Sequence, residues 1–453
     1  MSFADLAAPY AVYYDRYYPY AEIVRWLMRD GRVDPAYREW SYETLLRIGE
    51  TFVSRFRSVE TSEDLRKLLC FHPDTASSFL LKLDIGPIYS HPMGIRDSAG
   101  SSFVSVEREL VFDIDAGDFD RVRTCCQEAS ICPKCWRFME LVVPLLVLFA
   151  NVNGFNDYFF VFSGRRGLHA WMYDDVACRL TREMRLSLLQ SIQLVAADTG
   201  TFIDLRYDRE NWLCTLIYKE VCKPFFIKML VEQDWLGGSV GDPTNALHHI
   251  RETERVHLDQ NIQVFIKNAV LLFNNANNVV AGGKGTKGRQ SDLEKFDQAL
   301  EGFIRKLVTI PNVAEPEVSF RRWELLEKEL GGYPDILERL VVYYTYPRFD
   351  IEVTRTMNHL LKVPFSVHRK TCKISVPFPI APIYREYGLS ESLLPYRQEE
   401  HAYASFPRFV PDSAPTIIQL QAGETQVYDT YLDFFRRMTR TNPKADNVPP
   451  IVH

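Results

Sequence analysis

Two aspartates separated by one residue are the first feature of this sequence that suits chemistry. They lie in Glu109-Leu-Val-Phe-Asp-Ile-Asp115. Side chains alternate between the faces of a β-strand, so Asp113 and Asp115 would share one face while the apolar residues point into a core. Their Cα atoms would be about 6.6 Å apart, which suits two oxygen ligands on Mg²⁺ or Mn²⁺. The alternative is an edge strand with two solvated acids.

A cluster of four cysteines follows within eleven residues: Cys125, Cys126, Cys132 and Cys135. Four thiolates are the ligand count of a closed tetrahedral zinc site. Disulfides are the alternative, but adjacent cysteines bridge only with strain, and the N-terminus lacks the features of a secretory signal. We therefore expect a structural zinc knuckle over residues 125–135.

A glycine- and arginine-rich turn lies at Ser163-Gly-Arg-Arg-Gly-Leu-His169, between the strand-like runs 158–162 and 168–172. The guanidinium groups of Arg165 and Arg166 suit bidentate binding of phosphate oxygens. A hairpin turn with two solvated arginines explains the same residues, since turns are commonly polar and rich in glycine.

A further polar set lies between residues 347 and 368. Asp350 would complete a three-carboxylate metal site with the first two aspartates. Arg348, Lys362 and His368 would add cations around a triphosphate. Each of them alone is ordinary for a surface lysine or a core histidine, and only their occurrence with the other motifs favours a nucleotide site.

Charge and hydropathy restrict the partners. The chain has 453 residues with 53 Lys and Arg against 59 Asp and Glu, a net charge of −6. A polyanion must therefore be bound by a local basic surface and not by the molecule as a whole. The longest apolar run, Leu141–Ala150, contains Pro144, which we expect to break it, and is too short to span a bilayer. No membrane insertion is expected.

The expected architecture is α/β, with one catalytic lobe that is discontinuous in sequence. Fifteen of the 25 prolines follow residue 310, and only two lie between 145 and 310, so the middle of the chain is the natural helical region. Apolar residues at three- and four-residue steps predict helices over 179–197 and 291–307, the second with Ser291 and Glu294 as a capping box.

Short strand-like runs lie in the flanking parts of the chain, at residues 110–114, 158–162, 168–172, 349–353 and 373–376. We place the first part of the lobe at 1–180, a mainly helical insert at 181–320 and the second part of the lobe at 321–420. A C-terminal helix and tail would follow at 421–453.

Together these motifs resemble the catalytic small subunit of archaeo-eukaryotic DNA primases, in the order of the eukaryotic members. The resemblance rests on F-D-I-D followed by C-C-x5-C-P-K-C, then S-G-R-R-G-x-H, then P-R-F-D-I-x-V with N-H-L-L-K-x-P-F-S-V-H. It extends from Tyr13 to about Pro377 and is loose in the insert and the tail. It implies a mixed-sheet primase-type lobe. It also implies RNA primer synthesis on single-stranded DNA from NTPs when replication starts, in the nucleus.

The resemblance also implies roles for individual residues. Asp113, Asp115 and Asp350 would hold two Mg²⁺ or Mn²⁺ ions. The nucleotide-binding set would be Ser163, Gly164, Arg165, Arg166, Gly167, His169, Arg348, His359, Leu360, Leu361, Lys362 and His368. Glu39 matches a family residue implicated in activity, Arg55 would be a further phosphate contact, and Asp84 would sense the ribose hydroxyls. The four clustered cysteines would be structural zinc ligands.

Partners follow from the same resemblance. A large subunit with an iron–sulfur cluster and the DNA polymerase alpha complex are expected, and the cysteines left in this chain do not suit that cluster. The aromatic-rich N-terminus and the proline-rich region after 377 are candidate docking surfaces. Two other functions stay open: a primase-polymerase that uses dNTPs in damage bypass or end joining, and a non-catalytic zinc-containing nucleic-acid-binding adaptor.

Overall fold

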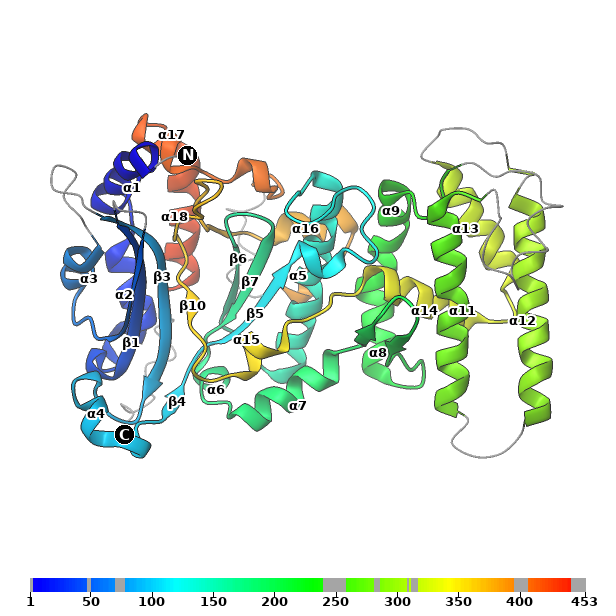
Figure 1. The fold of residues 1–453 in the computed structure, drawn as a ribbon, viewed down its shortest axis with the longest axis horizontal. Coiled ribbons are helices and arrows are strands. Elements are labelled where there is room, and N and C mark those ends of the chain that lie inside the picture. The colour runs from blue at the N-terminus through cyan, green and yellow to red at the C-terminus, as the bar shows by residue number, and fades with distance from the viewer. Residues whose placement is uncertain are drawn as a thin grey trace.

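The strands of this protein form two larger sheets and a two-stranded one (Figure 1). The structure is a computed structural model that describes residues 3–46, 50–69, 78–238, 258–280, 286–307, 309–310, 317–394 and 406–440. In the N-terminal sheet the order is β10-β3-β1-β2, and β4 pairs with β3. The second sheet has the order β11-β6-β7-β5, and β8 pairs with β9.

The strands of the N-terminal sheet are β1 (Arg38–Leu46), β2 (Thr51–Arg57), β3 (Ser78–Tyr89), β4 (Ser105–Glu107) and β10 (Leu361–Lys362). The others are β5 (Leu110–Asp115), β6 (Tyr158–Phe162), β7 (Gly167–Met172), β8 (Val195–Asp198), β9 (Ile203–Leu205) and β11 (Pro377–Phe378). All pairs of these strands are antiparallel. The expected α/β class is confirmed, but the mixed sheet is wrong, because hairpin and edge pairings join strands of opposite direction.

Helix α5 (Pro133–Asn153) packs against the second sheet and forms the centre of the core. The ring of Phe112 on β5 lies 5.2 Å from that of Phe149, and the ring of Phe162 on β6 lies 5.8 Å from that of Trp136. Pro144 does not break this helix as expected, because burial on all sides compensates for the backbone hydrogen bond that proline cannot donate. Among the described residues α5 alone is long and apolar enough to cross a membrane, and 89% of its most apolar window is buried.

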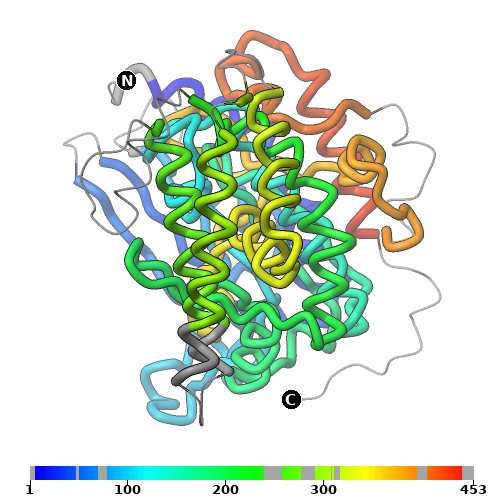
Figure 2. Tube along the Cα trace, turned by 90° about the vertical axis from the view of Figure 1, so that its right-hand side faces the viewer, coloured from blue at the N-terminus to red at the C-terminus, as the bar shows by residue number. Residues whose placement is uncertain are grey.

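Helices make up most of the middle of the chain. They are α6 (Asp175–Cys178), α7 (Arg182–Ile192), α8 (Trp212–Ile217), α9 (Lys223–Gln233), α11 (Gln260–Val280), α12 (Thr286–Leu307), α13 (Glu317–Glu329) and α14 (Pro334–Thr345). The long helices α11 and α12 run side by side (Figures 1 and 2), with the rings of Phe273 and Phe296 stacked at 4.0 Å. Helical structure thus continues past residue 320, where the predicted insert ends.

Two helix ends differ from the sequence prediction. The helix expected over 179–197 ends at Ile192, because the next residues form β8 and pair with β9. The capping box expected at Ser291 is wrong, since α12 begins at Thr286 and Ser291 lies inside it. Pairing with a partner strand is a tertiary contact that overrides a local helical pattern.

Helices from the two ends of the sequence pack together beside the N-terminal sheet and between it and the second sheet (Figure 1). They are α1 (Phe3–Arg16), α2 (Tyr20–Leu27), α3 (Ser62–Leu69), α17 (Ile417–Gln421) and α18 (Gln426–Met438). The hydroxyl of Tyr428 donates to the carbonyl of Tyr17 at 2.5 Å, and the rings of Trp26 and Phe435 lie 5.6 Å apart. The tyrosines of α1 are therefore largely core residues, and the N-terminal aromatic run is not the exposed docking surface expected.

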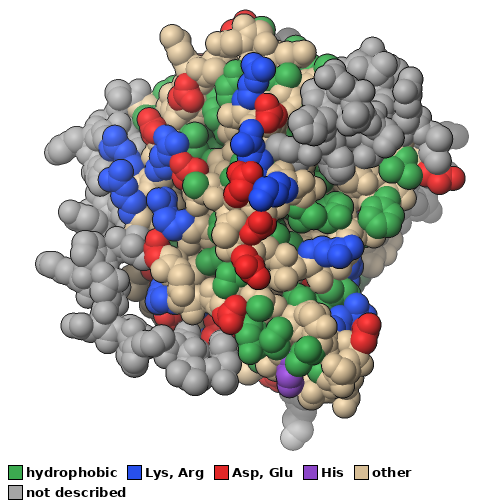
Figure 3. All heavy atoms as spheres, turned by 90° about the vertical axis from the view of Figure 1, so that its left-hand side faces the viewer, with side chains coloured by type: hydrophobic (Ala, Val, Ile, Leu, Met, Phe, Trp, Pro, Cys, Tyr) green, Lys and Arg blue, Asp and Glu red, His purple; other side chains and the backbone are tan. Residues whose placement is uncertain are grey.

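The outer face of this end of the molecule carries both signs of charge. Figure 3 shows Lys and Arg side chains lying among Asp and Glu side chains, with apolar side chains between them. Such a surface suits solubility better than the binding of a polyanion.

Candidate active site and cysteine cluster

The Asp-x-Asp strand is confirmed as β5, and β7 supplies a neighbour to each carboxylate. In the register of the two strands, Asp113 lies opposite His169 and Asp115 lies opposite Gly167. Atom Nε2 of His169 lies 3.5 Å from Oδ1 of Asp113. The side chains of the two aspartates are 44% and 42% exposed, so both carboxylates are accessible to cations.

Asp350 lies at the N-terminus of helix α15 (Ile351–Arg355), where its Oδ1 accepts a hydrogen bond from the amide of Glu352 at 2.9 Å. The strand predicted over 349–353 is therefore wrong, because this side chain caps a helix. Hydrogen bonds hold helix α15 against β5 and against Arg108, which precedes that strand. The hydroxyl of Thr354 donates to the carbonyl of Val111 at 2.8 Å, and Nη2 of the buried Arg108 donates to the carbonyl of Val353 at 2.6 Å.

A fourth acid, Asp118, lies close enough to the three predicted acids for their charges to affect it. Burial and the negative charges of Asp115, Asp113 and Asp350 together raise its pKa to about 6. Its carboxylate accepts a hydrogen bond from the amide of Asp115 at 3.0 Å, as one half of a capping box. The sequence prediction missed this fourth acid, although its position three residues after Asp115 is a capping-box signal.

The glycine- and arginine-rich turn connects β6 and β7 as a hairpin. The hydroxyl of Ser163 accepts a hydrogen bond from the amide of Gly167 at 3.0 Å. Gly164 has φ +93°, and a Cβ there would lie 2.6 Å from Cβ of His368, so only glycine fits this close approach. The segment that carries His368 thus packs directly on the turn.

The two arginines of the turn differ in their contacts. Nε of Arg166 lies 2.7 Å from Oδ1 of Asp115, so its charge is directed at a predicted metal ligand. Arg165 forms no ion pair with any described residue and is half-buried. Of the two, Arg165 is the one whose guanidinium is available to an incoming phosphate.

Lys362 joins the two sheets at this site. It belongs to β10, where it pairs with Asp84 of the N-terminal sheet, and its Nζ donates to the carbonyl of Ser163 at 2.8 Å. Burial lowers the pKa of Lys362 to about 7. Burial, together with the charges of Lys362 and Arg165, lowers the pKa of His368 to about 4, so this imidazole is neutral at pH 7. Burial likewise lowers the pKa of His169.

Asp84 is brought to the same place by strand register. It is 3% exposed, and its carboxylate lies 2.9 Å from Nζ of Lys82. Burial raises the pKa of this carboxyl group. Leu361 pairs with Ile85 beside it, and Leu360 is half-buried.

His359 and Arg348 take different positions. His359 is exposed, and its carbonyl accepts a hydrogen bond from Nη1 of Arg108 at 3.1 Å. Its pKa is lowered by partial burial of the ring and by the charge of Arg108. Nη2 of Arg348 lies 3.8 Å from Oδ2 of Asp198, and its guanidinium lies over the ring of Tyr343. No described contact brings Arg348 to the Ser163 turn.

Glu39 and Arg55 are brought together on the N-terminal sheet. The carboxylate of Glu39 is fully buried and accepts hydrogen bonds from Nε of Arg55 at 2.9 Å, from the amide of Phe56 at 3.3 Å and from the hydroxyl of Tyr89 at 3.1 Å. Glu39 therefore holds two strands and one arginine in place. It does not contact any of the three predicted metal ligands in the structure.

The four clustered cysteines converge as a metal site requires. Their sulfur atoms all lie within 4.8 Å of one another, and those of Cys132 and Cys135 are 3.8 Å apart. Ligand sulfurs about 2.3 Å from a tetrahedral zinc ion are separated by nearly this distance. None of the four forms a disulfide. The donor set fits zinc, and the knuckle extends into the first turn of α5, where Cys132 is the N-cap residue and Cys135 lies inside the helix.

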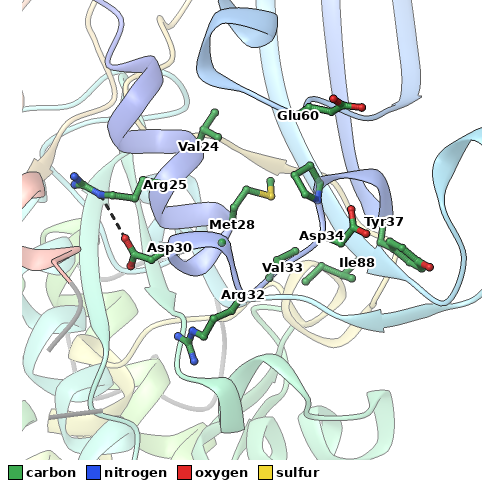
Figure 4. A pocket seen from close by; sticks show the side chains of 12 residues that line it. Val24, Arg25, Met28, Asp30, Arg32, Val33, Asp34, Tyr37, Glu60 and Ile88 are labelled. Carbon is green, nitrogen blue, oxygen red and sulfur yellow. Dashed lines mark ion pairs between the residues drawn. The ribbon is translucent and has the colours of Figure 1, made fainter. Parts of the chain in front are cut away.

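A cavity of about 620 Å³ lies beside α2 (Figure 4). Arg25 and Asp30 form an ion pair at 3.9 Å on one side of it, while Asp34, Tyr37 and Glu60 come from the opposite side. None of the predicted site residues lines this cavity.

Comparison with known proteins points to one family. The family described as DNA primase small subunit matches residues 112–380. The DNA primase small subunit of Schizosaccharomyces pombe is 28% identical over 374 residues, which cover 81% of this chain and 72% of the relative. That of Drosophila melanogaster is 28% identical over 420 residues, covering 90% and 80%. The small subunit of Pyrococcus horikoshii is 32% identical over 108 residues, covering 23% and 30%.

Proposed function

The chain belongs to the DNA primase small subunit family, and we propose that it synthesises RNA primers on single-stranded DNA from ribonucleoside triphosphates. One observation carries the proposal most directly. The acids of β5 and the cations of the Ser163 turn meet across the antiparallel pairing of β5 with β7, and Lys362 reaches the same turn from the other sheet. Acids beside cations are the combination that transfer of a nucleotidyl group requires.

The carboxylates of Asp113, Asp115 and Asp350 would hold the divalent cations. Two such ions, Mg²⁺ or Mn²⁺, activate an attacking 3′-hydroxyl and neutralise a leaving pyrophosphate. The donor set supports this assignment, because hard cations prefer carboxylate oxygens. Arg166 fixes the orientation of Asp115, and His169 does the same for Asp113.

The triphosphate would lie on the cations around the turn. Arg165 and Lys362 supply positive charge, and the neutral imidazole of His368 supplies one hydrogen bond without repelling them. Leu361 pairs with Ile85 next to Asp84, and Leu360 precedes it in the chain, so these two leucines would form a wall beside Asp84. This wall would contact the sugar.

The cysteine knuckle would bind one structural zinc ion. Its role would be to fix the segment between β5 and α5, since Cys125 and Cys126 lie in that segment and Cys132 and Cys135 lie at the start of α5. The catalytic acids and the zinc ligands would then be separate sites that share a short segment of chain.

Partners and location belong to the same proposal. A family described as a small subunit implies a large subunit, and we assign the iron–sulfur cluster to that partner, with DNA polymerase alpha joining the pair in the nucleus. The proline-rich region after 377 contains α16 (Ala381–Tyr387) and then α17 and α18, which are core elements. Only residues 441–453, which lie outside the described residues, are suitable for removal in a test of docking.

The experiment is de novo synthesis on poly(dT) with ATP and Mn²⁺. The wild-type chain is compared with Asp113→Asn/Asp115→Asn and with a matched control, Asp292→Asn/Glu294→Gln, which changes two exposed acids of α12. Product from the wild type and the control, and none from the first double variant, is the expected result. Equal product from all three proteins would refute the proposal.

Two further measurements distinguish the proposed primase from the two alternative functions. Competition between ATP and dATP identifies the primase-polymerase if the deoxynucleotide is incorporated preferentially. The non-catalytic adaptor predicts no dinucleotide product from any of the proteins and DNA binding that Asp113→Asn leaves unchanged.

A further inference from the structure

A second cavity, of about 610 Å³, adjoins the proposed active site through the segment 352–358. Asp350 lies two residues before this segment and His359 directly follows it. We propose that the cavity binds one unpaired base of the single-stranded DNA template, an inference that rests on the proposed function. The opposite wall comes from β2, the end of β3 and the loop around α4 (Arg96–Ala99), at the lower end of the N-terminal sheet in Figure 1.

Three aromatic rings form part of that wall. The rings of Tyr89 and Phe103 are stacked with centroids 4.2 Å apart, and the ring of Phe56 lies about equally far from both, at 6.2 Å and 6.3 Å. Phe56 and Phe103 are only half-buried, so part of each is open to the cavity. Aromatic surfaces that are already clustered and partly exposed suit the stacking of an unpaired base.

Two arginines at the cavity supply the charge that a phosphate requires. The guanidinium of Arg96 lies 3.8 Å from the ring centroid of Phe56, and Arg182 lines the cavity beside α15. Both are exposed, and neither forms an ion pair with a described residue. The acid at the cavity, Glu352, is already bonded to Arg355. The free charge of the cavity is thus positive, which is complementary to a nucleic acid strand.

Hydrogen bonds to the buried carboxylate of Glu39 fix the position of this aromatic wall. Glu39 accepts hydrogen bonds from Arg55, from the amide of Phe56 and from the hydroxyl of Tyr89. Phe56 has φ +57°, a left-handed conformation that is strained for an aromatic residue. The bond from its amide to a fully buried carboxylate compensates for this strain. This gives Glu39 a physical role as a positioning residue of the wall, separate from the metal ligands.

The position of the cavity favours the template over the other ligands. The triphosphate is assigned to the Ser163 turn, and the primer end must lie at the acids. Bases of the primer–template duplex are already stacked on one another. An unpaired template base next to the duplex has a free face, and the cavity lies one short segment away from the acids.

The test uses the full chain and fluorescence anisotropy with a labelled dT oligomer. Phe103→Ala removes one ring, and Arg96→Glu reverses an exposed charge without disturbing the core. Each is expected to raise the Kd for the oligomer about tenfold, since one stacked base or one phosphate contact contributes this much. Phe52→Ala is the matched control, because Phe52 is 51% exposed on the same strand β2 and does not line the cavity.

Two further arms make the outcomes distinct. Affinity for ATP with Mn²⁺ in the absence of DNA is expected to be unchanged in both variants. Both variants should bind an RNA–DNA hybrid with a 5′ template overhang more weakly than the wild type does. They should bind a blunt hybrid as tightly as the wild type does. Unchanged binding of the dT oligomer, or equal loss with the blunt hybrid, overturns the assignment. Failure of the proposed function appears separately, as absence of ATP binding and primer synthesis by the wild type.

Discussion

Replacing Thr354 by valine tests whether the position of Asp350 depends on a single hydrogen bond. Thr354 is fully buried in α15, and its hydroxyl donates to the carbonyl of Val111 on β5 at 2.8 Å. The bond therefore connects the helix capped by Asp350 to the strand that carries Asp113. Valine keeps nearly the same shape, so the change removes the bond and leaves no large cavity.

The magnitude follows from that one bond. A buried neutral hydrogen bond contributes about 1 kcal/mol to the free energy of unfolding. If the whole of this contribution holds α15 in its metal-binding position, the Kd for Mn²⁺ rises about fivefold, since 1.4 kcal/mol corresponds to tenfold. Thr345→Val is the matched control. Thr345 is also fully buried and donates to a carbonyl at 2.7 Å, but within α14 and to Val341.

Urea unfolding and calorimetric titration with MnCl₂ measure the two effects. Both variants should lose about 1 kcal/mol of unfolding free energy. Only Thr354→Val should bind Mn²⁺ more weakly. The same Mn²⁺ affinity in both variants, with both destabilised alike, would refute the claim that this bond positions the acid.

Three more outcomes are expected. Burial and the charge of Lys82 lower the pKa of Lys362 to about 7, while the charges of Asp84 and Asp113 oppose this shift. A bound triphosphate favours the charged form of Lys362, so ATP affinity should fall by up to about tenfold per pH unit above pH 7. Lys362→Arg should flatten this pH profile in calorimetric titrations. Cys132→Ser should abolish binding of one zinc ion per chain in elemental analysis and lower the melting temperature by about 5 °C or more, whereas Cys214→Ser should retain the metal. Gly86→Ala would place a Cβ 2.5 Å from Oε2 of Glu39 and should cost about 1–3 kcal/mol in urea unfolding, while Gly94→Ala, with no atom within 4 Å of the added carbon, should leave stability nearly unchanged.

Local patterns predicted the parts of the site that lie within one hairpin or one turn. The alternation around Asp113 and the glycines of the Ser163 turn are properties of a few consecutive residues, and the structure has β5, β6 and β7 there. The cysteine spacing predicted a cluster for the same reason. Such motifs depend little on distant parts of the chain.

What depends on distant contacts was not predictable in this way. The residues around Asp350 have apolar alternation, but the side chain of that residue caps a helix, and contacts with Arg108 decide where the helix lies. The strand expected over 373–376 is reduced to isolated bridges followed by β11 at Pro377. The pairing of Lys362 with Asp84 joins residues almost 280 positions apart, and no local signal contains it.

The missed residues follow the same division. Asp118 could have been predicted from the sequence, because its capping pattern involves only four consecutive residues. The wall around Glu39 could not be predicted, since the partners of that carboxylate come from the ends of β2 and β3, whose register only the folded sheet fixes.

The packing of the last helix on the first two has a consequence for synthesis of the chain on the ribosome. The ring of Trp26 in α2 is covered by Phe435 of α18, and Arg436 binds Glu22. More than 400 residues are translated between these partners. At about 5–20 residues per second this takes roughly 20–80 s. Throughout that interval the N-terminal aromatic side chains lack their final cover, so we expect the nascent chain to expose apolar surface that chaperones bind until α18 leaves the exit tunnel.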